Sequence, residues 1–306
     1  MKHAFLILTY KHYDQLKVLL KLLDHKDADI FIHADKTDTG FNEQDFKNIC
    51  QYSKVTMIPR IDVAWGDYTQ ELAEMNLIQA ALNADEHYDY FHFISGMDLP
   101  IKSMDHIMKF FEEHNGEIFV ECNDVLKLRS EFRFMLRYDV YHLFQKHIGK
   151  GRTFIKGKRW LKYIDFGQCI LQHIFGVSRT RKMVKNGITI KGGSQWFSIP
   201  RDFAEYINND RENILKFCHN GYCLDEVFMA TWLYNSPYYD RIYRGGRSYD
   251  SSLRRYKWIN FDPTMVTVDD IKEYDKEDDA IFARKFAIED NPEVVRFLLK
   301  RNNKEF

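Results

Sequence analysis

This chain of 306 residues has no long hydrophobic run. Its N-terminal apolar run, Ala4 to Leu8, is too short for a signal sequence, and no other apolar stretch approaches the ~18 residues of a membrane-spanning helix. Cysteine is also scarce, since the five cysteines are scattered and include no CxxC pair. They predict reduced thiols in place of a disulfide framework or a zinc site. We therefore expect a cytoplasmic protein, with any membrane attachment peripheral and on the inner face.

A strong net charge is missing too. The chain has 44 Lys and Arg against 45 Asp and Glu, a formal charge of −1, and 45% of its residues are hydrophobic. These values exclude a disordered tail and a highly basic nucleic-acid binder. Aromatic residues, by contrast, make up 15% of the chain. That content fits a cleft in which sugar rings stack on aromatic side chains, and it equally fits a core rich in phenylalanine.

Several well-known site motifs are absent from the sequence. No GxGxxG or GxxxxGK[ST] occurs, which argues against dinucleotide cofactors and P-loop phosphate transfer. Neither HExxH nor GxSxG occurs, which argues against zinc peptidases and hydrolases with a nucleophile elbow. Many sugar-nucleotide enzymes carry a DxD metal motif after the fourth strand, where this chain has a single carboxylate, Asp98. The stretch DAD at 27–29 precedes a strand and faces the wrong end of the sheet, so we expect no metal.

The first 120 residues alternate strand-like and helix-like patterns. Patterns of buried strands occur at 4–9, 29–35, 54–59 and 88–95. Patterns of amphipathic helices occur at 12–24 and 68–84, and Ser103 is placed to cap a further helix. This alternation predicts an α/β fold with a Rossmann-like, mainly parallel central sheet flanked by helices. The sequence contains no linker or repeat, so we expect a single domain over residues 1–306.

In sheets of this kind, ligands bind at the carboxyl ends of the strands. The side chains that follow the predicted strands are therefore candidates for a substrate site. They are Thr9, Asp35, Arg60, Trp65 and Asp98.

The rest of the chain contains further predicted elements. Residues 188–203 predict a strand or hairpin with a Gly-Gly turn, and then a helix that begins at Pro200. Residues 223–234 predict another helix, and the last helix is expected from Pro292 to about Lys300.

Residues 127–191 are strongly basic. They contain 16 Lys and Arg against three acids, a local charge of +13, and the part at 146–164 interleaves basic with aromatic residues. This segment is either a solvated excursion from the domain or a patch for an anionic partner, such as an acidic glycan, a lipid diphosphate or an anionic membrane. We do not expect nucleic acid as a partner, because no base-reading motif accompanies the basic residues.

Without a metal, a departing nucleoside diphosphate needs positively charged side chains. Two clusters in the C-terminal third can supply them, one with Arg254, Arg255 and Lys257 and the other with Arg284 and Lys285. In a strand, Arg284 and Lys285 point in opposite directions, so one of them is expected to face inward. A buried cation needs an anionic partner.

Two adjacent acids, Asp225 and Glu226, stand in the stretch LDEV at 224–227. Both could cap the helix predicted at 223–234. A glutamate in the first turn of a helix also feels the positive end of the helix dipole, which keeps it ionised and able to accept a proton. We interpret Asp225 as the cap and Glu226 as a catalytic base.

Taken together, these motifs resemble the core-2/I-branching family of glycosyltransferases, which groups β-1,6-N-acetylglucosaminyltransferases with peptide O-xylosyltransferases. The matching stretches keep the order of the family and span nearly the whole chain. They are FLILTYK (5–11), IFIHADK (30–36), VAWGDYTQELAEMNLIQAAL (63–82), FHFISGMDLPIKS (91–103), GGSQWFSIPRDF (192–203), LDEVFMATWL (224–233), LRRYKW (253–258) and FARKF (282–286).

The resemblance implies a GT-A-like fold without a DxD metal, and an inverting transfer of a sugar from a UDP-sugar. It places the catalytic base at Glu226, with Arg254 and Lys285 in place of the metal at the diphosphate. It also implies further substrate-binding candidates. These are Asp35 at the nucleoside, Glu121 toward the acceptor, and Asp98, Ser194, Trp196 and Asp225.

The function implied by this resemblance is a membrane-associated, metal-independent transferase, with GlcNAc as the expected sugar. Its acceptor would be a hydroxyl of a glycan or lipid-linked glycan in the synthesis of a cell-surface polysaccharide, and no cofactor is expected besides the UDP-sugar. Alternatives are UDP-xylose, UDP-glucose or UDP-galactose as donor, and a catalytically silent subunit that binds glycans or acts as a scaffold. Residues 127–191 match the family poorly, so the sequence does not predict which acceptor is used.

Overall fold

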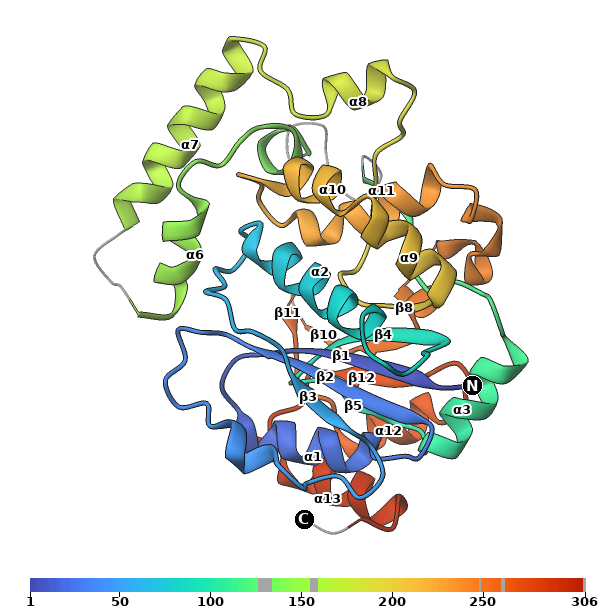
Figure 1. The fold of residues 1–306 in the computed structure, drawn as a ribbon. Coiled ribbons are helices and arrows are strands. Elements are labelled where there is room, and N and C mark those ends of the chain that lie inside the picture. The colour runs from blue at the N-terminus through green and yellow to red at the C-terminus, as the bar shows by residue number, and fades with distance from the viewer. Residues whose placement is uncertain (126–133, 155–158, 248, 260–261, 305–306) are drawn as a thin grey trace.

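A computed structural model gives the fold and describes residues 1–125, 134–154, 159–247, 249–259 and 262–304. Its central sheet has five strands in the order β3–β2–β1–β4–β8 (Figure 1). These strands are β1 (His3–Thr9), β2 (Ala28–Ala34), β3 (Val55–Met57), β4 (Tyr90–Ser95) and β8 (Phe197–Pro200). The first four are parallel, and β8 is antiparallel to β4. The predicted α/β fold with a mainly parallel central sheet is confirmed.

Both faces of the central sheet are covered by helices. A sheet in this position needs apolar side chains on both of its faces, which explains the nearly continuous apolar runs of β1 and β2. In β1, Phe5 and Ile7 belong to one buried cluster, whereas Ala4 and Leu6 belong to a second cluster on the other face. The alternation along a single strand thus connects the sheet to two hydrophobic layers.

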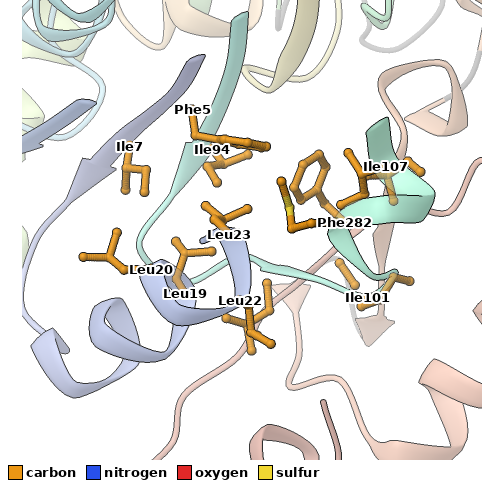
Figure 2. Close-up of a cluster of buried hydrophobic side chains, with 14 of the residues drawn as sticks. Phe5, Ile7, Leu19, Leu20, Leu22, Leu23, Ile94, Ile101, Ile107 and Phe282 are labelled. Carbon is orange, nitrogen blue, oxygen red and sulfur yellow. The ribbon is translucent and has the colours of Figure 1, made fainter. Parts of the chain in front are cut away.

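Four helices contribute buried side chains to the first cluster. They are α1 (Tyr13–Leu23), α3 (Met104–Glu113), α12 (Val268–Tyr274) and α13 (Pro292–Arg301). Figure 2 shows the leucines of α1 gathered with Phe5, Ile94 and Phe282 in this layer.

Four other helices contribute to the second cluster on the opposite face. They are α2 (Thr69–Leu82), α9 (Arg201–Asn209), α10 (Arg211–Cys218) and α11 (Phe228–Tyr234). The predicted helices at 12–24, at 68–84 and from Pro292 are confirmed, with their ends shifted by two residues at most. Ser103 caps α3 as predicted, since its Oγ accepts a hydrogen bond from the backbone N–H of His106 at 3.3 Å.

A second sheet of three strands has the order β5–β12–β9 and lies next to the central one. Its strands are β5 (Leu99–Pro100), β12 (Phe282–Arg284) and β9 (Arg254–Tyr256). Strand β12 runs parallel to β9 and places Arg284 opposite Tyr256. The two cationic stretches of the C-terminal third therefore lie side by side.

The remaining regular elements are short. Two-stranded pairs are formed by β6 (Asn123–Asp124) with β7 (Lys191–Gly192) and by β10 (Trp258–Ile259) with β11 (Asp262–Pro263). Turns of 3₁₀ helix occur at η1 (Glu43–Phe46), η3 (Leu224–Glu226), η4 (Tyr239–Arg241), η5 (Tyr243–Gly246) and η6 (Tyr249–Ser252).

The basic stretch at 127–191 contains a π-helical turn, η2 (Met135–Asp139), and three helices. The helices are α6 (Gln145–Phe154), α7 (Arg159–Ile174) and α8 (Arg181–Lys185). Figure 1 shows them on the far side of α2 and α10 from the sheet. Within the part of the chain that the structure describes, no helix combines the length and the apolar character that crossing a membrane requires.

Two sequence predictions were wrong in detail. The Gly-Gly pair within 188–203 is not a hairpin turn, because β7 and β8 belong to different sheets. The helix predicted at 223–234 is broken, since η3 ends at Glu226 and α11 begins at Phe228. Both departures involve residues of the candidate site, Gly193 and Glu226, whose backbones are hydrogen-bonded to each other.

Candidate active site

Glu226 lies at the end of η3 with its carboxylate held by two side chains. Its Oε2 accepts a hydrogen bond from the Tyr138 hydroxyl at 3.0 Å and lies 2.8 Å from an Nη of Arg137. Burial opposes the charge of Arg137, but the Glu226 carboxylate together with Cys223, Tyr138 and Tyr222 offsets that effect and raises the pKa of the guanidinium. Because 36% of the Glu226 side chain remains exposed, the fixed carboxylate can still meet a ligand.

The backbone at Glu226 leaves the helical path because of a contact from a distant strand. The Glu226 carbonyl accepts a hydrogen bond from Gly193 N–H at 2.8 Å, so it does not bond along a helix. Val227, with φ near −126°, separates η3 from α11. Glu226 therefore precedes α11 and does not lie in its first turn as predicted.

Asp225 does not cap a helix, which corrects its predicted role. The residue at the start of α11 is Val227, with no side-chain cap, and Oδ1 of Asp225 is buried without a hydrogen-bond partner among the described residues. Burial and the neighbouring Glu226 carboxylate raise the pKa of Asp225 to about 7. Asp225 is buried, and its predicted part in substrate binding stays a prediction.

Two further acids, Glu71 and Glu74 of α2, are fully buried near Asp225. Burial raises the pKa of each well above its ordinary value, and the charge of Asp225 raises both further. In the described part of the chain, neither oxygen of Glu74 has a hydrogen-bond partner. These acids are stable in this position as neutral carboxylic acids.

Aromatic side chains lie on one side of Glu226. Trp65, which is 41% exposed, meets Tyr222 edge to face with ring centroids 5.7 Å apart. The guanidinium of Arg137 lies over the Tyr222 ring at 5.4 Å. Trp65 and Tyr222 also line a cavity of about 300 Å³ next to α7. The predicted residue Trp65 is thus close to the Glu226 carboxylate, where a sugar ring could stack on it.

Residues 192–194 connect Glu226 to the second sheet. A Cβ on Gly193 would lie 2.0 Å from the carbonyl oxygen of Glu121, so only glycine allows this approach. One residue further on, the Ser194 hydroxyl lies 2.9 Å from the Tyr256 hydroxyl of β9. Glu121 Oε1 accepts a hydrogen bond from Asn123 at 2.9 Å. The backbones of Glu121 and Glu226 therefore both lie against Gly193, the residue before Ser194.

Asp98, Trp196 and Arg284 form a buried group after β4. The Nε of Arg284 lies 3.3 Å from Asp98 Oδ1, and its guanidinium lies 4.4 Å from the centre of the Trp196 ring. Asp98 also accepts hydrogen bonds from the backbone N–H and the hydroxyl of Ser95 at 2.8 and 3.1 Å. Arg284 is thus the inward-facing cation of the predicted pair, and Asp98 is its anionic partner.

Lys285 is half-buried beside this group. Its backbone follows β12, and the next residue, Phe286, donates a hydrogen bond to the carbonyl of Met97 at 3.0 Å, in the turn that holds Asp98. Among the described residues, the Lys285 ammonium has no hydrogen bond or ion pair, in contrast to Lys257, which pairs with Asp270 at 2.7 Å. An unpaired ammonium next to the carboxyl ends of the strands is available for an anion.

Arg254 is fully buried, and its predicted contact with a diphosphate stays a prediction. Its guanidinium donates to the carbonyls of Phe93 at 3.1 Å and Phe197 at 2.8 Å, and to the Ser198 hydroxyl at 3.2 Å. Burial lowers its pKa to about 10. In this arrangement Arg254 links the backbone of β4 to that of β8 and stabilises the strands next to the site.

The candidates after β1 and β2 lie at the same edge of the sheet. Thr9 packs against Gly96, where a Cβ would lie 2.4 Å from the Thr9 hydroxyl, and its carbonyl accepts a hydrogen bond from Asp35 N–H at 3.1 Å. Asp35 itself accepts hydrogen bonds from the backbone and hydroxyl of Thr37 at 2.8 and 2.9 Å. Arg60 binds backbone carbonyls, including that of Ala34 at 3.1 Å, and orders this loop.

His142, Asp165 and Cys169 form a separate group whose potential metal-ligating atoms lie within 4.8 Å of one another. His142 Nδ1 lies 2.8 Å from Asp165 Oδ2, and its Nε2 lies 2.9 Å from the carbonyl oxygen of Leu136. These contacts fasten α7 to the segment that carries Arg137. The group is remote from the expected DxD position, and the prediction of a metal-free reaction stays a prediction.

Sequence reasoning missed four residues of this site: Arg137, Tyr138, Tyr222 and Tyr256. Arg137 and Tyr138 lie in the basic stretch. The sequence does not distinguish this arginine from the many other basic residues there. Tyr222 and Tyr256 stand inside or beside stretches already singled out, but only the fold shows which of their neighbours they meet.

Known proteins share sequence with most of this chain. A family model described as Core-2/I-Branching enzyme matches residues 3–278. The chain is 25% identical to xylosyltransferase 1 of Homo sapiens over 250 residues, which are 80% of this chain and 22% of that protein. It is 23% identical to a xylosyltransferase of Ciona intestinalis over 300 residues, 93% of this chain and 32% of that protein. The chain thus spans less than a third of the length of these two relatives.

Among solved structures, a Bacillus anthracis protein described as a glucose-1-phosphate thymidylyltransferase aligns with 47% of this chain and 60% of its own. The TM-score is 0.24 and the sequence identity 18%.

Proposed function

This chain belongs to the Core-2/I-Branching enzyme family, and from that premise we propose that it is an inverting glycosyltransferase that uses a UDP-sugar. The observation that carries the proposal is the Glu226 carboxylate, which is partly exposed and fixed by Arg137 and Tyr138, with the Tyr222 ring against Arg137 and the Trp65 ring against Tyr222. A carboxylate fixed beside aromatic rings is suited to act on a hydroxyl of a bound sugar.

In the proposed reaction, Glu226 takes the proton of the acceptor hydroxyl as the acceptor oxygen forms a bond to the anomeric carbon of the donor. The bond from that carbon to the diphosphate breaks on the opposite face, so the configuration inverts, and UDP leaves with the electron pair. Arg137 and Tyr138 hold the carboxylate in the position from which it removes the proton.

The negative charge that develops on UDP needs compensation. We propose that Lys285 binds the diphosphate, because its ammonium is half-buried and has no partner among the described residues. Arg284, which forms an ion pair with Asp98, adds to the positive potential there. Together they would supply the stabilisation that a metal provides elsewhere, so the reaction is proposed to be independent of metal. Arg254 would act through the strands that it joins.

The other predicted residues have places in this proposal as well. Asp35 and Thr9 would face the nucleoside, with Asp98 and Trp196 beneath the donor sugar. Glu121 and Ser194 would contact the sugars near Glu226. Arg60 would order the loop that carries Asp35.

Donor and acceptor are the finer part of the proposal. GlcNAc is the sugar first expected from the family, and UDP-xylose is the second candidate because the named relatives are xylosyltransferases. UDP-glucose and UDP-galactose remain alternatives. The acceptor is proposed to be a glycan or lipid-linked glycan of a cell-surface polysaccharide, used by a cytoplasmic enzyme that contacts an anionic membrane through residues 146–164. A silent glycan-binding subunit is the alternative to an enzyme.

The test is the release of UDP from UDP-GlcNAc and UDP-xylose by the wild-type chain and by Glu226→Gln, each with and without excess EDTA. We expect turnover that survives EDTA and that falls at least about 10³-fold in Glu226→Gln, with UDP affinity retained. Glu113→Gln, on the exposed side of α3, is the matched control and should behave as wild type. Full activity of Glu226→Gln would remove Glu226 as the base, and the absence of any binding of UDP or UDP-sugar would favour the silent subunit.

A further inference from the structure

Helix α7 buries mostly polar side chains. Its buried or half-buried stripe, at the spacing of one helix face, consists of Leu161, Asp165, Gln168, Cys169 and Gln172. Gln168 and Gln172 each donate a hydrogen bond to the carbonyl of Tyr141 at 2.8 Å, and Asp165 meets His142. A surface helix of a soluble protein normally buries its apolar face, so α7 is inverted.

The opposite face of α7 and the residues after it are apolar and exposed. Tyr163 and Phe175 are 77% and 78% exposed, and the others are exposed by between 44% and 68%. The set consists of Trp160, Tyr163, Ile164, Leu171, Ile174 and Phe175. Within the helix these positions are three, four, eleven and fourteen residues from Trp160, which places them along one stripe.

Exposed apolar side chains are concentrated in this region of the molecule. Of the 13 large hydrophobic residues that are exposed in the described chain, 11 lie between 141 and 184. Scattered exposed apolar residues need no explanation on a protein surface, but such a local concentration marks an interaction site. The basic stretch is therefore more than a solvated excursion.

The charges around this face have one sign. Between residues 140 and 191 the sequence contains a single acid, Asp165, and that residue is buried against His142. Lys162 of α7 is exposed, as are Arg181, Lys182 and Lys185 of α8. The occupant of this face consequently has apolar groups next to negative charges.

We propose that the outer face of α7, with Phe175 and the cations of α8, docks on the surface of an anionic lipid membrane. Trp and Tyr prefer the boundary between headgroups and acyl chains, apolar side chains insert below it, and Lys and Arg bind the anionic headgroups. This face combines all three kinds of side chain. The contact proposed for residues 146–164 is thereby moved to a surface centred on α7 and α8.

The docked surface lies close to the candidate active site. Lys162 and Phe166 of α7 line the same cavity of about 300 Å³ as Trp65 and Tyr222. A lipid-linked acceptor held at the membrane would reach Glu226 from this side, an extension that rests on the proposed function. Docking itself does not depend on the reaction.

The inference is tested by flotation of the full chain with two kinds of vesicle, phosphatidylcholine alone and phosphatidylcholine mixed with phosphatidylglycerol. We expect the wild-type chain to float with the mixed vesicles, and binding to weaken as NaCl is raised. The double variant Ile164→Glu/Ile174→Glu should lose about tenfold or more of this binding. Tyr52→Glu, which changes an exposed aromatic residue outside the basic stretch, should bind as wild type.

Circular dichroism and the calorimetric affinity for UDP report whether the double variant is folded, so loss of vesicle binding with both retained supports the proposal. Wild type that floats with neither vesicle, or a folded double variant that floats like wild type, overturns it. Wild-type dimers that the double variant dissociates, without flotation, would instead assign this face to a second copy of the chain. If UDP binds but vesicles do not, the membrane inference fails while the proposed function stands.

Discussion

At the scale of single residues, the environment of Glu226 is assembled from distant parts of the chain. Tyr138, which donates to its carboxylate, lies 88 residues away in sequence. Arg137 pairs with the Glu226 carboxylate, and its charge also favours the ionised form of the neighbouring buried Asp225. Its contribution should therefore appear in the chemical step.

We expect Arg137→Met to lower kcat about 10- to 100-fold while KM for the UDP-sugar stays nearly constant, because the base is no longer held in position. Tyr138→Phe removes one neutral hydrogen bond and should have a smaller effect. Steady-state kinetics of both variants provide the measurement, and Arg137→Lys should recover part of the loss. An increase in KM without a change in kcat would contradict the positioning role.

Lys285 is the residue proposed to bind the diphosphate. Lys285→Ala should weaken the binding of UDP by about 10- to 100-fold, the value of a charged hydrogen bond, and leave the weak binding of uridine almost unchanged. Calorimetric titration with both ligands measures this difference. Lys300→Ala, at an exposed position of α13, serves as the control, and equal losses for UDP and uridine would exclude the diphosphate role.

At the scale of elements, α2 and η3 contribute carboxylic acids that are buried in the protein interior. Glu71, Glu74 and Asp225 have raised pKa values, so the folded chain keeps protons that the unfolded chain has lost. For such acids, folding is most favourable below the unfolded pKa, near 4.5 for a glutamate, and the contribution is lost as the pH rises. The loss amounts to at most about 1.4 kcal/mol per pH unit for each group.

Thermal stability should accordingly fall from about pH 5 toward pH 8, within the window set by these three acids. Glu74→Gln keeps the shape of the side chain and removes its ionisation, so we expect a flatter pH profile and a higher Tm at neutral pH. Melting curves across this range provide the measurement, with Glu113→Gln as the exposed control. A variant with the slope of wild type would show that Glu74 is not the source.

Sequence periodicity predicted most elements well, because β1, β2, α1 and α2 bury regular apolar stripes. It failed where a contact between distant segments decides the backbone. The helix predicted at 223–234 has good local propensity, but the bond from Gly193 to the Glu226 carbonyl replaces a helical bond and breaks it. No pattern within a dozen residues contains that information.

The candidate site was predictable only where motifs carried it. Glu226 and Trp65 both lie near Arg137 and Tyr222, and Lys285 follows Arg284, which pairs with Asp98, whereas Arg254 is fully buried. Arg254 and Arg255 are consecutive residues of one strand, and the sequence does not show which of the two side chains faces the core. The exposed apolar face of α7 could not be predicted for a similar reason. The pattern of an amphipathic helix does not show which of its two faces is buried.

At the scale of the whole molecule, the net charge is near zero, but the positive and negative charges are concentrated in different parts of the sequence. The chain carries −1 in total while residues 127–191 carry +13, so the remaining residues carry −14. We expect the protein to bind a cation-exchange resin at pH 7 through α8 and its surroundings in spite of its net charge. Elution in a NaCl gradient measures this affinity.

Arg181→Glu/Lys185→Glu should elute at clearly lower salt than wild type. Lys272→Glu/Lys276→Glu, at exposed positions in α12 and just after it, changes the net charge equally but lies in the negative part, and should elute close to wild type. Equal shifts for the two variants would mean that total charge, and not its separation, governs the binding.

The inverted helix α7 also affects how this chain would find its acceptor. A protein seated through that face moves sideways in two dimensions with its active site at a fixed height above the lipid. Its rate would then follow the number of acceptors per unit area of membrane, and diluting the solution around the membrane would leave that rate unchanged.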